Sequence, residues 1–72
     1  MDKFAERLKQ LRNDRKMTQV EICKQFEIQE RSYQNYEIGK SKPTYATLIK
    51  IADFHDVPLD YLVGRSDDPK RR

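Results

Sequence analysis

Residues 18–37 restrict the possible folds of this chain more than any other stretch. They predict two short helices joined by a tight turn, because Thr18 and Glu21 have the spacing of a capping box and apolar residues recur at helical intervals on both sides of Glu27 and Ile28. Each helix can therefore bury one face against the other. The residues expected to face inward are Val20, Ile22, Cys23 and Phe26 in the first helix, and Ser32, Tyr33 and Tyr36 in the second.

The second of these helices, which should begin at Gln29 or Glu30, keeps a polar outer face. Long hydrogen-bonding side chains at Glu30, Arg31, Gln34 and Asn35 recur at helical spacing on the side opposite the apolar residues. Two packed helices with such an outer face have the layout of a helix-turn-helix, whose second helix can enter the major groove of DNA. The stretch therefore predicts a protein that reads a DNA sequence.

The rest of the chain predicts a compact all-α domain of five helices. Apolar residues at positions 4, 5, 8 and 11 indicate a first helix over about residues 2–15. Thr44 is a suitable N-cap for a fourth helix ending near His55, and Pro58 suits the first turn of a short fifth helix that Gly64 stops. We expect one domain over residues 1–65 and a flexible polar and basic tail over residues 66–72.

Composition argues against several classes of protein. Cys23 is the single cysteine in 72 residues, so no intrachain disulfide can form, which agrees with a reducing cytoplasm. Cys23 and His55 alone do not make a zinc site. The charged N-terminus is unlike a signal peptide, and no apolar run reaches membrane length. No catalytic set of residues is evident, and so small a domain has no room for a deep pocket. We expect a cytoplasmic protein that is not an enzyme, with no membrane segment, metal, cofactor or small-molecule ligand.

The charge of the chain is distributed unevenly. The net charge is +3, yet residues 1–42 carry ten basic and seven acidic side chains, whereas residues 43–69 carry two basic and five acidic ones. The half that contains the polar outer face is therefore electropositive, as attraction to phosphate requires.

Several short motifs, in this order and at these intervals, extend the argument to nearly the whole chain. They are Leu11-Arg12, Thr18-Gln19, Tyr36-Glu37-x-Gly39-Lys40, Lys42-Pro43-Thr44, and the run from Val57 to Gly64. Together they resemble the lambda-repressor/Cro-like (XRE-type) family of helix-turn-helix transcriptional regulators. The resemblance covers residues 4–64 and implies a five-helix DNA-binding domain.

The resemblance also implies roles for individual residues. Arg12 and Glu37 match positions that form an ion pair between the first and third helices in relatives. The expected base-reading residues are Glu30, Arg31, Gln34 and Asn35. The expected phosphate contacts are Gln19, Gln29, Lys40, Ser41, Lys42 and Tyr45, of which Tyr45 is suggested by its own position at the start of the fourth helix. Side-chain chemistry agrees independently, because Arg pairs with guanine, Asn with adenine, and a carboxylate accepts from cytosine N4.

The function implied by the family is sequence-specific binding of double-stranded DNA, as a repressor that binds a palindromic operator as a homodimer. The apolar residues of the last helix are either core or a dimer surface, namely Leu59, Tyr61, Leu62 and Val63. An alternative function is a protein-interaction module of the antitoxin or antirepressor type. Its support is the acidic C-terminal half and the residues Phe54 and His55 near a possible interface.

Three residues depart from the family pattern. Glu27 and Asp56 occupy turns where relatives usually have glycine, so a positive φ would strain Glu27 by about 1 kcal/mol relative to glycine. His55 replaces a core leucine. We expect it to be a partly exposed residue at the helix end, with Phe54 buried instead. Cys23 is expected to be a buried, inert thiol.

Overall fold

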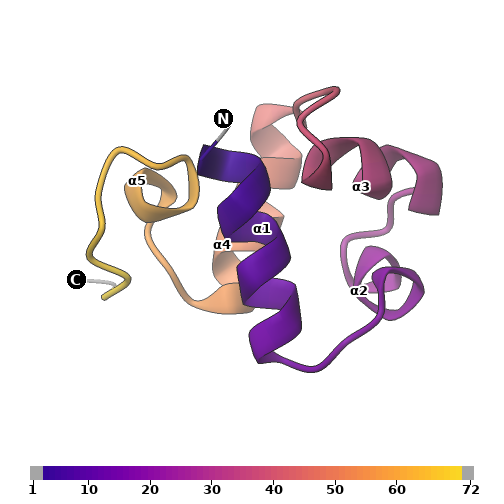
Figure 1. The fold of residues 1–72 in the computed structure, drawn as a ribbon, viewed down its shortest axis with the longest axis horizontal. Coiled ribbons are helices and arrows are strands. Elements are labelled where there is room, and N and C mark those ends of the chain that lie inside the picture. Colours follow the sequence, from indigo (N-terminus) through magenta and orange to yellow (C-terminus); the bar gives the residue numbers. More distant parts are fainter. Residues whose placement is uncertain (1–2, 71–72) are drawn as a thin grey trace.

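The computed structural model describes residues 3–70 of the chain, and this part is all-α, as predicted. Five helices follow one another in the order α1 (Lys3–Asp14), α2 (Gln19–Gln25), α3 (Glu30–Glu37), α4 (Tyr45–His55) and α5 (Leu59–Leu62). In Figure 1, α1 crosses the middle of the molecule, with α2 and α3 on one side and α5 on the other. Helix α1 packs against both α3 and α5, so it joins the predicted helix-turn-helix to the C-terminal part.

Every helix contributes at least one fully buried side chain to a single core. The largest side chains with less than 2% exposure are Leu8, Ile22, Phe26, Tyr33, Ile51 and Leu62. Burying a side chain of this size stabilises the fold by about 1.5–3 kcal/mol, so a core that draws on all five helices makes each of them depend on the others. Phe26 lies at its centre, with its ring 6.3 Å from that of Tyr33 and 5.4 Å from that of Phe54.

The predicted capping box fixes the start of α2. The Glu21 backbone N–H donates to Thr18 Oγ1 at 3.1 Å, and the Thr18 N–H donates to Glu21 Oε1 at 2.8 Å. The hydrogen bond from the Thr18 backbone N–H lowers the pKa of the Glu21 carboxyl. Thr44 caps α4 in a simpler way, since its hydroxyl accepts from the Thr47 N–H at 3.3 Å. Both helix starts were therefore predictable from local sequence.

Among the described residues 3–70, three residues other than glycine have a left-handed backbone. Glu27 and Asp56 have φ values of 56° and 54°, which are the conformations that their glycine-like positions suggested, and Lys16 has a φ of 57°. Gly64 has a φ of 86°, and a Cβ added there would lie 2.6 Å from the Lys3 Cβ. Glycine is therefore required at residue 64 both by the turn that ends α5 and by the close approach of α1.

The prediction that Val20 faces inward is wrong. Its exposed fraction is 43%, whereas Ile22 and Cys23 are buried. Residues two positions apart in a helix do not share a face, so the side that buries Ile22 and Phe26 turns Val20 outward. Cys23 is a buried free thiol that donates to the Val20 carbonyl at 3.2 Å.

The expectation for His55 is also wrong, because this residue is buried with an exposed fraction of 7%. The centre of its ring lies 5.1 Å from that of Phe54 and 6.2 Å from that of Phe26. Arg15, beyond the end of α1, donates from Nε to His55 Nδ1 at 3.1 Å and from Nη2 to the Phe54 carbonyl at 2.7 Å. Phe54, expected to be buried in place of His55, is half-buried beneath the Arg15 guanidinium.

Burial and the positive charge of Arg15 together lower the pKa of His55 to about 4, and burial has the larger effect. The carboxylate of Asp14 opposes them only in part. The imidazole is therefore neutral at pH 7. Its Nε2 atom is buried and has no hydrogen-bond partner among residues 3–70.

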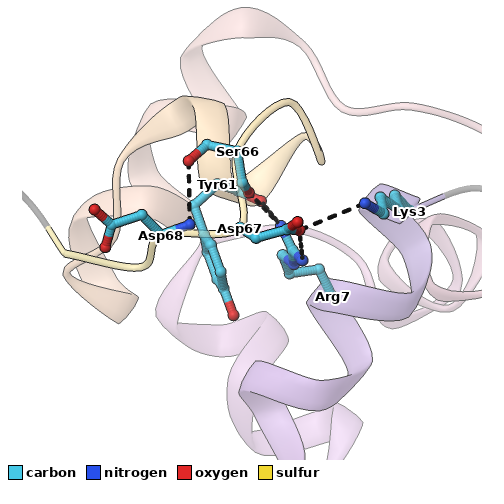
Figure 2. Close-up of polar contacts among 6 residues, drawn as sticks. All are labelled: Lys3, Arg7, Tyr61, Ser66, Asp67 and Asp68. Carbon is cyan, nitrogen blue, oxygen red and sulfur yellow. Dashed lines mark hydrogen bonds and ion pairs between the residues drawn. The ribbon is translucent and has the colours of Figure 1, made fainter.

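Residues 66 and 67, at the start of the predicted tail, make hydrogen bonds to α1. Figure 2 shows Arg7 donating from Nη1 to the carbonyls of Tyr61 and Ser66, at 2.7 and 2.8 Å, and from Nη2 to Asp67 Oδ1 at 3.2 Å. The same guanidinium lies 4.0 Å from the centre of the Tyr61 ring. The partner of Asp67 is 60 residues away in sequence, so the local composition of the tail gave no sign of it. The domain boundary at residue 65 stays a prediction, and residues 71 and 72 lie outside the described part.

Candidate nucleic-acid interface

The predicted ion pair between Arg12 and Glu37 is present and holds α3 against α1. Arg12 Nε donates to Glu37 Oε2 at 2.7 Å, and Nη2 donates to Oε1 at 3.2 Å. The remaining Arg12 nitrogen, Nη1, donates to the Met17 carbonyl at 2.9 Å, in the loop before α2. The two side chains are only 13% and 3% exposed. One guanidinium therefore fixes the end of α3 and the approach to α2 together.

Gln19 completes this buried cluster in the free protein. Its Nε2 donates to Glu37 Oε1 at 3.1 Å, so the side chain expected at a phosphate is already bonded to α3. Burial alone would raise the pKa of Glu37, but the hydrogen bonds that Arg12 and Gln19 donate to its carboxylate, with the Tyr33 hydroxyl nearby, hold it below its usual value. Burial and the neighbouring Glu37 carboxylate raise the pKa of Tyr33. Glu37 is therefore ionised at neutral pH and Tyr33 is not.

The outer face of α3 is free of the protein body. Tyr33 and Glu37 bury the opposite side of the helix, with exposed fractions of 0% and 8%. The four expected base-reading residues occupy the other side: Glu30 and Arg31 are exposed, and Gln34 and Asn35 are half-buried. The side-chain hydrogen bond found within this set joins Gln34 Nε2 to Glu30 Oε2 at 3.2 Å. Within residues 3–70, no hydrogen bond joins any of these four side chains to another element.

The expected phosphate contacts lie at both ends of α3 and at the start of α4. Gln29 is the exposed N-cap residue of α3, and its side chain makes no capping hydrogen bond. Lys40, Ser41 and Lys42 are exposed in the loop after α3, whose backbone returns to the Asn35 carbonyl through the Lys40 N–H at 2.9 Å. Tyr45, the first residue of α4, is 72% exposed. The eight-residue helix between Gln29 and this loop is about 12 Å long.

The four apolar residues named as core or dimer surface, in α5 and directly after it, differ in exposure. Leu62 has an exposed fraction of 0%, so it belongs to the core, which is one of the two alternatives that the sequence left open. Val63 is 37% exposed, while Leu59 and Tyr61 are half-buried. The short α5 turns Leu62 toward α1 and α4, which four residues of sequence do not reveal.

Two residues that sequence reasoning missed lie beside the buried ion pair. A hollow next to it is lined by Lys9, Arg12, Thr18, Gln19, Glu37 and Ile38. Lys9 adds a cation there, and Ile38 is 71% exposed although it is apolar. An isoleucine directly after the last residue of α3, at the C-cap, is the signal that could have drawn attention to this surface.

The His, Cys, Asp and Glu side chains of residues 3–70 form no group able to hold a metal ion. None of the helices in this part of the chain combines the length and the apolar character needed to cross a membrane.

Known proteins match this chain along most of its length. A helix-turn-helix family model matches residues 8–62. The uncharacterized regulator YqaE of Bacillus subtilis is 41% identical over 66 residues, covering 90% of this chain and 57% of YqaE. YobD of the same organism, also an uncharacterized HTH-type transcriptional regulator, is 36% identical over 66 residues, covering 92% of this chain and 59% of YobD. The cryptic phage CTXphi transcriptional repressor RstR of Vibrio cholerae is 38% identical over 63 residues, covering 88% and 56%.

A solved structure agrees with these matches. A transcriptional regulator from Listeria innocua superimposes with a TM-score of 0.85 and 28% identity, covering 94% of this chain and 64% of that one. The present chain spans somewhat more than half the length of the relatives named above. The family match, the five helices and the ion pair between α1 and α3 agree, and the chain belongs to the Cro/C1-type (XRE) helix-turn-helix family of transcriptional regulators.

Proposed function

We propose that this chain binds double-stranded DNA in a sequence-specific way and acts as a transcriptional repressor in the cytoplasm. One observation carries the proposal. Tyr33 and Glu37 hold α3 from within, so the side that bears Arg31 and Asn35 is left to enter a major groove. RstR, one of the relatives, is a repressor by name, which favours repression over activation.

The base-reading face offers chemistry for more than one base. Arg31 can donate two hydrogen bonds to guanine O6 and N7, and Asn35 can pair with adenine N6 and N7. The negative charge of Glu30 repels phosphate, so this residue serves selectivity rather than affinity. Gln34 lies one turn after Glu30 and completes the set.

Phosphate contacts would flank this face. Lys40, Ser41 and Lys42 follow α3, Gln29 precedes it, and Tyr45 opens α4. Because the Gln19 side chain is bonded to Glu37, we assign its phosphate contact to the backbone N–H at the start of α2.

We further propose a homodimer on a palindromic operator. One reading helix covers a few base pairs, and two related by a two-fold axis would lie about 34 Å apart and double the specific contacts. The exposed part of α5, Val63 with the edges of Leu59 and Tyr61, is our candidate for the contact between protomers.

Selection of bound duplexes from a random pool tests the proposal directly. The parent chain should enrich a two-fold symmetric sequence, and Arg31→Ala should weaken binding by about 1–3 kcal/mol and relax the preference at one base pair. Lys40→Ala is the matched control. It should weaken all duplexes alike and reduce the salt dependence by about one unit. Enrichment that Arg31→Ala leaves unchanged would contradict the reading face.

The alternative, a protein-interaction module, is weaker in the light of the structure. His55, which suggested an interface, is buried beneath Arg15. Weak association with DNA that does not respond to salt would restore this alternative.

A further inference from the structure

We infer that Glu30 is a positioning residue that orients the carboxamide of Gln34, and that Gln34 selects an adenine. The inference rests on the proposed function and refines it. It gives the two residues different roles, although sequence reasoning treated both as independent base readers. The observation behind it is the hydrogen bond from Gln34 Nε2 to Glu30 Oε2, at 3.2 Å, across one turn of α3.

The chemistry of the pair gives the bond a direction. A carboxylate only accepts hydrogen bonds, whereas a primary amide has a donating end and an accepting end. Glu30 therefore attracts Nε2 of Gln34 and repels Oε1, so the two ends of the amide cannot exchange freely. A free glutamine at this place would present either end to a base.

The oriented amide keeps what adenine recognition needs. Its two N–H groups point in different directions, so one can be donated to Glu30 while the other stays beside Oε1. This remaining edge carries one donor and one acceptor, which match N7 and the N6 amino group of adenine in the major groove. Guanine offers two acceptors along the same edge and would meet Oε1 unfavourably.

The position of Glu30 suits this role. It is the first residue of α3, where the partial positive charge of the helix N-terminus favours a carboxylate. The capping hydrogen bond that a carboxylate often provides at a helix start is absent here, since the N-cap residue is Gln29 and makes none. A negative charge on a face that contacts DNA reduces affinity. The role of the Glu30 charge on this face would be to orient Gln34.

The experiment compares the base preferences of five proteins, each obtained by selection from a random duplex pool. We expect the parent to prefer adenine at one position. Gln34→Ala should lose about tenfold or more of this discrimination, because the amide that contacts the base is gone. Glu30→Ala should reduce discrimination at that same position by about 3–10-fold, because the amide must then be ordered on binding. The double variant Glu30→Ala/Gln34→Ala should lose no more than Gln34→Ala alone, because the two residues act as one unit.

Glu30→Gln is the matched control, since it removes the charge but keeps an accepting oxygen at the same distance. Because an amide at residue 30 can also donate, the orientation of Gln34 is partly lost, and the adenine preference should lie between those of the parent and Glu30→Ala, while binding to all duplexes becomes tighter because one negative charge is lost. A pair one turn apart on a helix surface adds little stability, so thermal unfolding of each Glu30 variant should stay within about 3 °C of the parent. Altered preferences can then be assigned to recognition rather than to unfolding.

Three outcomes would overturn the inference. Glu30→Ala could leave the adenine position unchanged, or it could remove a preference for cytosine at another position, which would make Glu30 a base reader itself. Gln34→Ala could leave every preference intact, which would remove Gln34 from the base contacts. A parent that enriches no sequence would instead refute the proposed function, and the inference with it.

Discussion

Arg12 and Arg15 lie one helical turn apart near the end of α1, yet they join it to different parts of the fold by different chemistry. Arg12 meets a buried, ionised carboxylate, Glu37 of α3, at 2.7 Å. Arg15 meets a buried, neutral imidazole, His55 of α4, and a backbone carbonyl. In the first region two charges compensate each other. In the second, the positive charge of Arg15 lies over the neutral His55 ring and a carbonyl. Protonation should therefore destabilise the two regions at different pH values.

The largest effect is expected from removal of the Glu37 carboxylate. Glu37→Ala leaves Arg12 buried without its counter-charge, which should lower the free energy of unfolding by about 3–5 kcal/mol. Urea unfolding followed by circular dichroism measures this loss. Glu27→Ala is the matched control, because this exposed carboxylate lies 3.7 Å from Lys50 and should contribute less than about 1 kcal/mol. If both variants lost the same free energy of unfolding, burial would not make the Arg12–Glu37 pair more important for stability than an exposed ion pair.

The next effect is an acid destabilisation that comes from His55. The pKa of its side chain is about 4 in the folded chain and near 6.5 in the unfolded chain, so the unfolded chain takes up the proton first as the pH falls. The stabilisation is fully present above about pH 6.5 and is lost as the pH drops to 4, by roughly 3 kcal/mol in total.

This window separates His55 from Glu37. The pKa of Glu37 lies below the usual glutamate value, so its contribution is present above that value and is lost at lower pH, as the folded carboxyl takes up a proton. His55→Leu should remove the pH dependence between 6.5 and 4 and keep the loss at lower pH, as measured by the free energy of unfolding across this range. A His55→Leu chain that is still destabilised between pH 6.5 and 4 would assign the effect to other groups.

The smallest effect is expected from the other arginine. Arg15→Ala removes a hydrogen bond and a positive charge beside His55 but leaves no buried charge behind, so the loss of stability should be about 1–2 kcal/mol. The pKa of His55, followed by NMR, should rise because the ring gains access to water and loses a like charge. Lys9→Ala, at an exposed site on α1, should change neither quantity. A His55 pKa that does not move would mean that burial by the phenylalanine rings alone keeps the imidazole neutral.

The contrast between the two arginines also shows where reading the sequence succeeded. The bridge from Arg12 to Glu37 was expected because both residues fall in motifs of a family resemblance. The capping box at Thr18 was expected because its partner is three residues away. The left-handed backbone at Glu27 was left open by the sequence, although relatives have glycine at this position. For the ion pair and the capping box, the signal was local or belonged to a known pattern.

The interactions that were missed join residues far apart in the chain. Arg15 and His55 are separated by 40 residues, and Arg7 and Asp67 by 60. Nothing near His55 in the sequence shows that an arginine covers it, so its exposure was misjudged. The error at Val20 has a different cause, because α2 has only seven residues and a small rotation decides which side chains are buried.

The sequence by itself determined the five helices, their order, their starts and the polar outer face of α3, because these depend on hydrogen bonds and periodicity within a few residues. Only the tertiary structure decided which polar side chains become buried and what they bond to, including Gln19 on Glu37, His55 under Arg15 and Asp67 on Arg7. The physical reason is that burial and charge pairing depend on distances between helices, and these distances are set by how the whole core packs.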